Sequence, residues 1–421
     1  MAVEAAPITQ CRVCGNTSLV SCIPLGKQHL SSIFPTHLNY RTSTAQWPLE
    51  LVLCAHRESP PSCGLVQLAH HVDLNAMYQE YPYTSSTNSS MPLMLKEVAD
   101  DGLALGHLQK GDVILDIGAN DGTLLSCFRG QGFKLLGIDP AQNVQPIFQD
   151  PHYTHVRQLF SQAVYRTAAH RKAKLITSIA MFYHLNDPVR FSREVAACLD
   201  AEGAWIIQMA YLPSMLRTNM YDNIVHEHCG YYAIRQLQWI MEQVGLAIFD
   251  VTLNDVYGGS FRVFVKHQGC TRHPESNRYR RLLQEEEAEG LADPATYQAF
   301  MGRIEKTRED LVRLCRSVRA QGKSIWVYGA STKGNVILQY CGIGKEEIDA
   351  AADANPFKHG KYLIGTDIPI RDEAALRLAK PDYLLVLPYS FVNHFIQRES
   401  QLVTQGTRFI VPLPEVHLLP G

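Results

Sequence analysis

The segment YDNIVHEHCGYY, from Tyr221 to Tyr232, places two histidines around a glutamate and surrounds them with tyrosines. An imidazole has an unperturbed pKa close to neutral pH, so His226 or His228 could take up or release a proton under physiological conditions. Such a segment suits a metal site, a catalytic base with its supporting groups, or a polar surface. Zinc sites on one helical face use His-x-x-x-His and a third ligand, whereas these histidines are two positions apart. The spacing therefore disfavours a metal here.

Cysteines with metal-ligand spacing lie in the first part of the chain. CRVCGN supplies Cys11 and Cys14 in the form of a zinc knuckle, LELVLC reads as a strand that ends at Cys54, and CGLVQLAH begins at Cys63. We predict one tetrahedral zinc held by these four thiolates, and a structural one, because four protein ligands leave no open position. The wide gap between Cys54 and Cys63 leaves alternatives open. The cysteines could simply be reduced and buried, or another residue could supply a ligand: Cys22, His56 or His70.

Glycines and acidic groups come together in DIGANDGTLL, directly after an apolar strand. Glycines let backbone amides approach a ligand at a helix N-terminus. Dinucleotide-binding proteins use G-x-G-x-x-G, which is absent here, and the acids suit a cationic ligand without phosphates, such as S-adenosylmethionine (SAM). Asp139, which ends KLLGIDP, stands about 20 residues further on, where a carboxylate would accept ribose hydroxyls. We predict that SAM is bound by Asp116, Gly118, Asn120, Asp121, Gly122 and Asp139; a nicotinamide cofactor and an empty Rossmann-like domain are the alternatives.

The elements that must position these residues form two α/β patterns. VILDI, KLLGI, KLITSI and GAWIIQMAY read as strands between helical patterns, and SIWVY opens a second unit that continues with DYLLVLPYS and RFIVPLPE. Such alternation indicates mostly parallel, doubly wound sheets. We predict the fold class α/β, with a zinc-binding domain at residues 1–75, a SAM-binding Rossmann-like domain at residues 76–255 and a second Rossmann-like domain at residues 256–421.

Composition excludes several functions. The 421 residues carry a net charge of −2 without a long basic run, which argues against a nucleic-acid partner. No apolar run is long enough to span a bilayer, and MAVEAAPITQ lacks the basic-then-apolar form of a signal peptide. The 11 cysteines are odd in number and mostly scattered, as expected in a reducing compartment. We expect a cytoplasmic protein that acts on a small molecule.

Beyond these patterns, the chain resembles a known family, the zinc-containing sugar C-methyltransferases of deoxysugar pathways. The resemblance covers nearly the whole chain and rests on motifs in a fixed order: CRVCG, CGLVQL, YPYTSS, DIGANDGTLL, GIDP, HEHCGYY, YGGSFRVFV, YGASTKGN, YCGI, DANPFKHGKY, DYLLVLPYS and VPLPE. It implies a zinc domain, a central class I methyltransferase domain, a C-terminal Rossmann-like domain that helps to hold a nucleotide sugar, and a monomer. It also implies methylation of carbon beside the ketone of a dTDP-4-keto-6-deoxysugar, through an enolate and without a catalytic metal.

The resemblance assigns roles to individual residues. His228, the second histidine of HEH, matches the general base, and Glu227 matches a glutamate that orients a ring or binds the substrate. His184, in MFYHLND, matches an active-site histidine placed to steady the enolate or a sugar oxygen. Tyr83, and less closely Tyr81, matches the family's N-terminal active-site tyrosine.

A second ligand-binding loop is predicted in VYGASTKGN. Backbone amides at a helix N-terminus and the charge of Lys333 make an anion site, to which Asn335 adds an amide. With SAM in the first α/β unit, the anion would be the pyrophosphate of the substrate, and Arg262 in GGSFRVF would be a second contact. The alternative is a loop that only packs.

One position departs from the family pattern. The family has an aromatic residue, often tyrosine, directly before HEH, and this chain has Val225. Unless Tyr221 or Tyr231 replaces it, a hydroxyl that would bind the sugar or the enolate is missing, which puts the substrate in doubt more than the reaction type. Three other functions stay open: methylation of another acidic carbon or hydroxyl on a natural-product intermediate, a nicotinamide-dependent dehydrogenase or epimerase, and a zinc-ribbon binding module.

Overall fold

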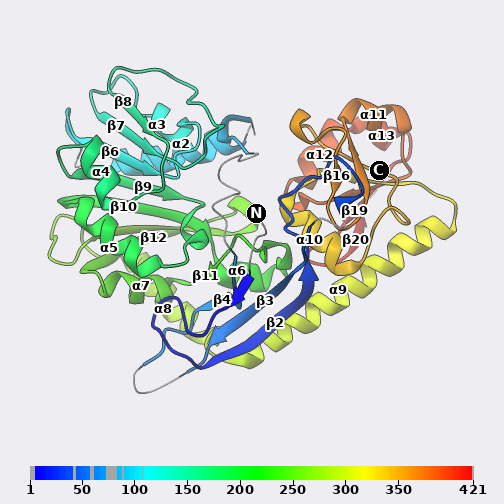
Figure 1. The fold of residues 1–421 in the computed structure, drawn as a ribbon, viewed down its shortest axis with the longest axis horizontal. Helices are drawn as coiled ribbons and strands as arrows, with labels where there is room; N and C mark the ends of the chain where they lie inside the picture. Colours follow the sequence, from blue (N-terminus) through cyan, green and yellow to red (C-terminus); the bar gives the residue numbers. More distant parts are fainter. Residues whose placement is uncertain are drawn as a thin grey trace.

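The computed structural model describes residues 5–40, 44–56, 61–72, 83–87, 90–106 and 108–419. Two seven-stranded sheets, a four-stranded sheet and a two-stranded ribbon organise these residues. Figure 1 shows the two large sheets next to each other, the central one in green and cyan and the C-terminal one in orange and red. Across the described ranges, no helix combines the length and the apolar character that crossing a membrane requires.

The small antiparallel sheet carries the N-terminal cysteines, and its order is β11-β4-β3-β2. The strands span Leu19–Gln28 (β2), Trp47–Cys54 (β3), Val66–Leu68 (β4) and Gly230–Tyr231 (β11). Strand β11 directly follows the HEHC residues, and it pairs Gly230 with Gln67 and Tyr231 with Val66. The segment that carries the predicted base is therefore attached to the edge of the zinc-binding sheet. The ribbon beside it joins Ala5–Pro7 (β1) to His70–Val72 (β5).

The central sheet has the order β12-β13-β10-β9-β6-β7-β8. Its strands span Val113–Ile117 (β6), Lys134–Ile138 (β7), Tyr153–Val156 (β8), Ala173–Ile179 (β9), Leu199–Ala210 (β10), Leu246–Asn254 (β12) and Ser260–His267 (β13). Strands β6 to β10 run parallel, as predicted, and β13 runs antiparallel to both of its neighbours. Because β13 lies beyond residue 255, the domain boundary predicted there falls inside this sheet. The boundary predicted at residue 75 lies outside the described residues.

Helices cover both faces of the central sheet. They span Ser90–Ala104 (α2), Thr123–Ser126 (α3), Gln162–Ala168 (α4), Pro188–Cys198 (α5), Leu212–Arg217 (α6), Ile234–Glu242 (α7) and Asn277–Ala288 (α8). Side chains cap the first turns of α4 and α5: Ser161 accepts a hydrogen bond from the Val164 amide, and Asp187 accepts one from the Arg190 amide. Helix α2 buries Val98 and Ala99 in a cluster that also includes Leu175 of β9.

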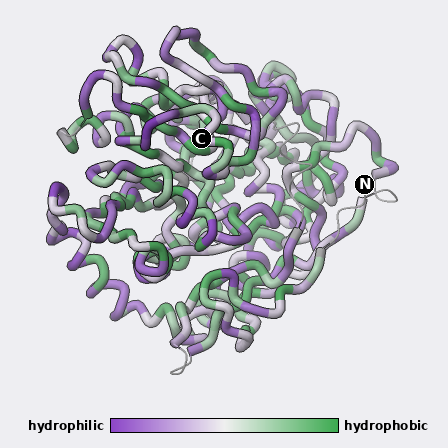
Figure 2. Tube along the Cα trace, turned by 60° about the vertical axis from the view of Figure 1, so that its left-hand side comes forward, coloured by the Kyte–Doolittle hydropathy of each residue, from purple (hydrophilic) through white to green (hydrophobic). Residues whose placement is uncertain are grey.

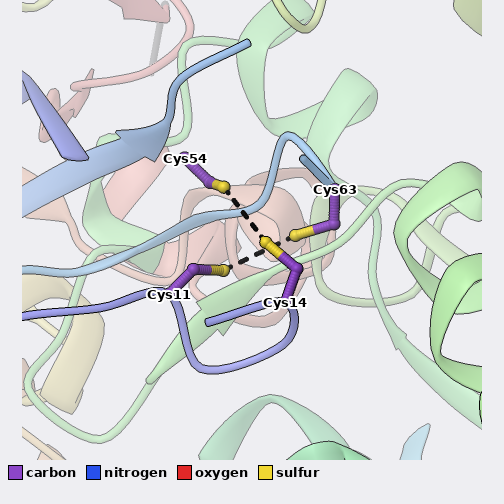
Figure 3. A group of neighbouring side chains, drawn as sticks. All are labelled: Cys11, Cys14, Cys54 and Cys63. Atoms are coloured by element: carbon purple, nitrogen blue, oxygen red, sulfur yellow. Dashed lines mark hydrogen bonds between the residues drawn. The ribbon is translucent and has the colours of Figure 1, made fainter. Parts of the chain in front are cut away.

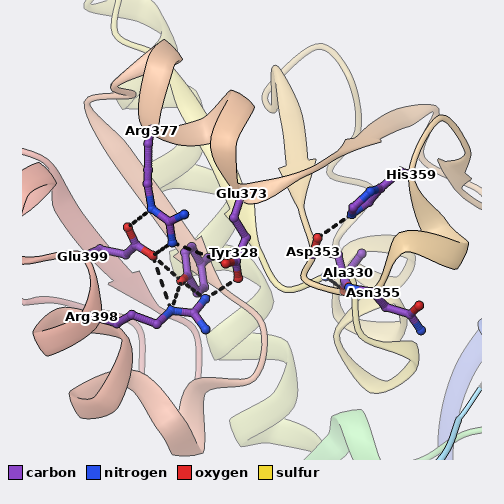
Figure 4. Close-up of polar contacts among 9 residues, drawn as sticks. All are labelled: Tyr328, Ala330, Asp353, Asn355, His359, Glu373, Arg377, Arg398 and Glu399. Carbon is purple, nitrogen blue, oxygen red and sulfur yellow. Dashed lines mark hydrogen bonds and ion pairs between the residues drawn. The ribbon is translucent and has the colours of Figure 1, made fainter. Parts of the chain in front are cut away.

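The C-terminal sheet has the order β16-β17-β15-β14-β18-β19-β20. Its strands span Ile325–Tyr328 (β14), Ala350–Ala352 (β15), Tyr362–Leu363 (β16), Ile368–Arg371 (β17), Tyr383–Val386 (β18), Arg408–Val411 (β19) and His417–Leu419 (β20). Its helices span Thr332–Cys341 (α10), Glu373–Ala379 (α11), Val392–Arg398 (α12) and Ser400–Thr404 (α13). Figure 4 shows Arg377 and Arg398 converging with Glu399 on Tyr328, which fastens α11 and α12 to β14.

A long helix and an N-terminal segment join the parts. Helix α9, Pro294–Ala320, begins after the capping residue Asp293 and buries one face that includes Ile304, Leu311 and Val318. It runs along β2 and reaches the C-terminal sheet (Figure 1). Figure 2 shows hydrophilic and hydrophobic residues alternating along the peripheral helices, as expected of helices with one face on a core. The predicted α/β class with its additional zinc-binding part is confirmed.

The segment after β2 binds directly to the C-terminal sheet. The His29 amide donates to the side chain of Gln339 at 2.9 Å, and Gln339 donates back to the His29 carbonyl at 3.3 Å. The Tyr40 hydroxyl donates to Asp367 at 2.7 Å and accepts from the Gly365 amide at 2.9 Å. These reciprocal bonds fix the N-terminal part to the C-terminal part.

Candidate active site

The four predicted zinc ligands converge between the knuckle and the β3–β4 connection (Figure 3). The sulfur atoms of Cys11, Cys14, Cys54 and Cys63 all lie within 4.8 Å of one another, and the Cys11–Cys63 and Cys14–Cys54 distances are both 3.5 Å. Sulfur atoms around one tetrahedral zinc, each about 2.3 Å from the metal, stand about 3.8 Å apart. The cluster therefore has the size that one zinc requires. In the described part of the chain, no other group of His, Cys, Asp and Glu ligands gathers this closely.

The backbone of the knuckle supports the thiolates. The Val13 amide points to the sulfur of Cys11 at 3.5 Å, and the side-chain amide of Asn16 points to that of Cys54 at 3.4 Å. Hydrogen bonds of this kind stabilise the charged form of a thiol, which is the form that binds a metal. Cys22 lies apart and donates its thiol to the carbonyl of Leu51.

Strand β6 carries a buried carboxyl group near its carboxyl end. Asp116 accepts a hydrogen bond from the Thr177 hydroxyl at 2.6 Å, and burial raises the pKa of Asp116 to about 7. Gly118 follows with a φ of 78°, and a Cβ at this position would stand 3.3 Å from the side chain of Met181. Only glycine combines this conformation with this close approach.

The next residues connect the loop to its surroundings. The Asn120 amide donates to one carboxylate oxygen of Asp139 at 2.8 Å, and the Ala141 amide donates to the other at 2.8 Å. The side chain of Asn120 accepts from the Ser85 amide at 2.8 Å and donates to the Tyr83 carbonyl at 3.1 Å. Asn120 therefore holds the Tyr83 segment over the loop.

Two of the predicted cofactor residues support the loop from behind. Asp121 accepts hydrogen bonds from the hydroxyl and amide of Thr123 and from the Ser86 amide. Gly122, with a φ of 77°, precedes α3, and a Cβ there would stand 3.0 Å from the Tyr153 hydroxyl. Neither residue lines the cavity described next.

One cavity of about 840 Å³ brings the predicted chemistry together. Its volume lies within the range of small-molecule sites, about 300–1,000 Å³. It extends from the loop after β6, past the HEH segment, to the first turn of α10. Nine predicted residues line it: Tyr83, Asp116, Gly118, Asn120, Asp139, His184, Glu227, His228 and Lys333.

His228 is held in one tautomer. Its Nδ1 lies 2.7 Å from the backbone carbonyl oxygen of Asn223, which can only accept, so Nδ1 carries the hydrogen and Nε2 keeps a free lone pair. The Tyr231 hydroxyl donates to the same carbonyl at 3.3 Å. Burial, together with the nearby His184 and Lys333, holds the pKa of His228 well below its ordinary value. His228 is therefore neutral at neutral pH and able to accept a proton.

Two neighbouring rings pack against His228. Tyr183 lies with its ring centroid 4.2 Å away, and His184 stacks at 5.4 Å with an angle of 24° between the planes. Both residues end the one-turn helix after β9. Burial lowers the pKa of His184 to about 4, so this second imidazole is also neutral at neutral pH and can donate one hydrogen bond.

The other two residues of HEH differ in their surroundings. His226 is buried, and its Nε2 lies 3.3 Å from the carbonyl oxygen of Trp47 at the start of β3, so this ring fixes the segment to the zinc-binding sheet. Glu227 lines the cavity, and burial raises the pKa of its carboxyl group, while Ser32 opposes the shift.

Lys333 enters the cavity from the first turn of α10, beside Thr332. Ser331 caps this helix by accepting from the Gly334 amide at 3.0 Å. Burial lowers the pKa of Lys333, and the carboxylate of Asp222 raises it in opposition. Asp222 also accepts a hydrogen bond from the Tyr389 hydroxyl at 3.1 Å, so the C-terminal part contacts the segment that carries the histidines.

The acid at the end of β15 is engaged within the protein. In a dinucleotide-binding sheet, an acid at this position binds the ribose. Here Asp353 accepts from the Ala330 amide at 2.8 Å, and its carbonyl lies 2.8 Å from the ring of His359 (Figure 4). It also accepts from Nζ of Lys358 at 2.9 Å. Asp353 therefore connects the loops after β14 and β15 at this edge of the C-terminal sheet.

Three residues predicted to bind the substrate do not line the cavity. Arg262 of β13 is buried and directs its guanidinium group to Asp101 and to Gln208. Asn335 is fully buried and donates to the Ile364 carbonyl at 3.2 Å. Tyr221 is also fully buried, with its hydroxyl 3.7 Å from the sulfur of Cys341. Tyr81 lies outside the described residues.

Some residues that shape the site were not predicted. Asn223 supplies the carbonyl that fixes His228, Tyr183 packs on the same ring, and Asp222 lies near Lys333. Asn223 and Asp222 belong to the quoted YDNIVHEH segment, so their closeness in sequence was a signal. The contribution of Asn223, however, comes from its backbone, which side-chain motifs do not report.

Comparisons with known proteins agree with this architecture. Three family models match in order: "Putative zinc binding domain" over residues 11–78, "Methyltransferase domain" over residues 93–251 and "C-methyltransferase C-terminal domain" over residues 255–414. The chain is 31% identical over 415 residues to C-methyltransferase NovU of Streptomyces niveus, with 98% of this chain and 97% of that protein covered. The chain therefore belongs to the C-methyltransferase family.

Solved structures are similar at a lower level. Magnesium protoporphyrin IX methyltransferase ChlM from Synechocystis PCC 6803 with bound SAM has a TM-score of 0.30 and 14% identity, covering 41% of this chain and 78% of that one. The CcbJ methyltransferase from Streptomyces caelestis has a TM-score of 0.32 and 12% identity, covering 46% and 96%. The family assignment rests on the sequence relative and the three models.

The chain is thus a SAM-dependent C-methyltransferase with a zinc-binding domain. Its residues fit both groups. The four-sulfur cluster has the donor set and spacing for zinc. The cavity contains a buried carboxyl group for a cationic ligand and, in Asp139, a carboxylate at the end of β7 with lone pairs left for hydroxyl groups.

Proposed function

We propose that this enzyme methylates a carbon atom adjacent to the ketone of a nucleotide-linked 4-keto-6-deoxysugar of the dTDP type. One observation carries the proposal: a single cavity joins the SAM-binding loop, the neutral His228 and Lys333. A C-methyltransferase needs a base beside the cofactor, and a nucleotide sugar needs an anchor for its phosphates. Lining residues of this cavity can supply both.

His228 acts as the general base in this proposal. Its Nε2 removes the proton from the carbon next to the ketone, and the electron pair of the C–H bond moves to form the enolate. The Asn223 carbonyl keeps the acceptor nitrogen directed away from the backbone and stabilises the imidazolium that results. Bound at the loop, SAM would supply the electrophilic sulfonium methyl group that the carbon nucleophile takes, with S-adenosylhomocysteine as the leaving group.

His184 stabilises the enolate oxygen. As a neutral imidazole it has one N–H to donate, and a donor placed where negative charge develops lowers the barrier. Glu227 and Tyr83 line the same cavity and complete the polar surroundings of the sugar.

The pyrophosphate of the substrate binds at Lys333 and the first turn of α10. A partly buried ammonium group at the first turn of a helix attracts an anion, because its charge and the helix dipole act together. Asp121 and Gly122 support the SAM loop, and we assign no substrate contact to Arg262, Asn335 or Tyr221, because none of them lines the cavity.

Val225 supports a second candidate substrate. This apolar residue lines the cavity next to the HEH triplet, so it offers no hydroxyl to a sugar. A keto intermediate of another natural product, with an apolar group at this position, would suit the same base and cofactor.

The test is mass spectrometry of the zinc-loaded enzyme incubated with SAM and a panel of dTDP-4-keto-6-deoxysugars. We expect the gain of one methyl group on a sugar of this panel, bound to carbon as located by NMR. If SAM binds but every sugar stays unmethylated, while a non-sugar ketone acquires the methyl group, the sugar proposal is wrong and the second candidate replaces it.

A further inference from the structure

We infer that Arg12, between the two cysteines of the knuckle, is a positioning residue: it fixes the strand that carries the catalytic segment and thereby places His228. This inference rests on the proposed role of His228. It gives the zinc knuckle a part in catalysis beyond the stability of its own fold.

The hydrogen bonds of Arg12 all lead to one strand and its continuation. Its Nη1 donates to the Leu68 carbonyl at 2.6 Å and its Nη2 to the His70 carbonyl at 3.1 Å. Its backbone amide donates to the side-chain oxygen of Gln67 at 3.0 Å, and Nη1 also reaches that oxygen at 3.4 Å. Gln67 and Leu68 belong to β4, and His70 begins β5.

The hydrogen-bond acceptors of the guanidinium group are uncharged oxygen atoms. Among the described residues, no carboxylate forms an ion pair with Arg12. Removing a cation from water is costly without an opposite charge. A planar fork of donors, however, can hold several carbonyl groups in a fixed relation, which a lysine cannot do. The arrangement fits a geometric role.

Strand β4 in turn carries the catalytic segment. The Leu68 amide donates to the Cys229 carbonyl at 3.1 Å, directly after His228, and β4 then pairs with β11. On the other side of His228, His226 contacts the Trp47 carbonyl of β3. His228 thus lies between two residues that contact the zinc-binding sheet, Cys229 at β4 and His226 at β3. Arg12 holds β4 in place through its hydrogen bonds.

The zinc knuckle would restrict the movement of the Arg12 backbone. Its neighbours Cys11 and Cys14 are both predicted zinc ligands, so the metal would hold the backbone on both sides of the guanidinium group. The SAM loop depends on other contacts, chiefly Asp139 and Thr177 on the central sheet. A loosened Arg12 should therefore disturb the base and leave the cofactor site intact.

The experiment compares Arg12→Met and Arg12→Lys with the wild type, and Arg313→Met serves as the matched control, because Arg313 is exposed on α9. Five quantities are measured: zinc content, the Kd of SAM by calorimetry, kcat, KM, and amide hydrogen exchange of the peptides at residues 224–232 and 113–122. Hydrogen exchange measures how often each segment opens locally, and this measurement does not depend on catalytic turnover.

We expect Arg12→Met to keep its zinc and its SAM affinity. Exchange at residues 224–232 should become at least roughly tenfold faster, and kcat should fall by roughly 100-fold, since a displaced base loses its alignment. Exchange at residues 113–122 should not change, Arg12→Lys should lie between the wild type and Arg12→Met, and Arg313→Met should match the wild type.

Two results would overturn the inference. In the first, both Arg12 variants keep wild-type exchange and kcat. In the second, zinc and SAM affinity are lost together with activity even in Arg12→Lys, which would make Arg12 a general folding residue. The proposed function fails separately: if His228→Ala retains turnover, His228 is not the base, whatever the exchange data show for Arg12.

Discussion

The chemistry of single residues in this enzyme is decided by their neighbours. The role of base that we propose for His228 depends on one backbone carbonyl, which takes its Nδ1 hydrogen, and on surroundings that disfavour the imidazolium. His184, in similar surroundings, is neutral too and is left with a donor role. Two adjacent histidines can thus act as base and as hydrogen-bond donor without a charge on either.

The pH dependence of the reaction should follow the lowered pKa of His228. Protonation removes the base, and a lowered pKa keeps the neutral form present at lower pH, so kcat/KM for the substrate should stay level from about pH 7.5 down through about pH 6.5. It should fall only below that range. The profile must be recorded at saturating SAM. Burial raises the pKa of Asp116 to about 7, and protonation of this carboxylate weakens the binding of a cationic ligand. If kcat/KM reached half of its maximum at pH 6.5 or above, the pKa of His228 would not be lowered, and this account would be wrong.

The types of the site residues could be predicted from sequence, but some of their contacts could not. Asp116 and Gly118 of DIGANDG and His228 of HEH line the cavity because short motifs fix local geometry. Arg262 and Tyr221 carry equally suggestive side chains, yet they are buried away from it. Their burial depends on partners such as Asp101 and Cys341, which are distant in sequence.

At the scale of elements, two of the strands that the sequence analysis did not predict, β11 and β13, escaped for the same reason. Strand β13 completes the central sheet from beyond residue 255, and β11 leaves the central segment to join the zinc-binding sheet. Both are antiparallel additions, and an antiparallel partner can come from any part of the chain. The parallel strands were predictable, because alternation with helices constrains which strands lie together.

Arg262 should behave as a structural residue of this sheet. Its guanidinium group joins β13 to Asp101 of α2 and to Gln208 of β10, so Arg262→Met should lower the free energy of unfolding by about 1–3 kcal/mol. The KM for the substrate should stay within twofold of the wild type. Thermal unfolding and steady-state kinetics check both, with the exposed Arg281→Met as control. An unchanged melting temperature together with a raised KM would show that Arg262 binds the substrate and does not stabilise the sheet.

At the scale of the whole molecule, the active site exists only where three parts meet. The central sheet supplies the SAM loop, the edge of the zinc-binding sheet holds the HEH segment, and α10 of the C-terminal part supplies Lys333. Reciprocal bonds of His29 and Tyr40 fasten the N-terminal segment to the C-terminal part. The sequence predicts the three parts but not their contacts, which arise from side chains far apart in the chain. The monomeric state and the cytoplasmic location stay predictions.

Lys333 should matter for substrate binding more than for turnover. Lys333→Ala removes a charge-assisted contact, so the KM for a nucleotide sugar should rise by roughly tenfold to a hundredfold with a smaller change in kcat. Lys345→Ala is the matched control, because Lys345 is exposed in the same part of the chain. Steady-state kinetics at saturating SAM would decide, and an unchanged KM would count against a phosphate at Lys333.

The central claim is that His228 removes the proton, and solvent exchange tests it most directly. The enzyme is incubated in deuterated water with S-adenosylhomocysteine and a substrate ketone, so that proton removal is observed without methyl transfer. We predict that wild type and His394→Gln, an exposed histidine of α12, exchange the hydrogen beside the ketone in the NMR spectrum, and that His228→Gln binds the ketone without exchange. Exchange by His228→Gln at the wild-type rate would show that another group is the base.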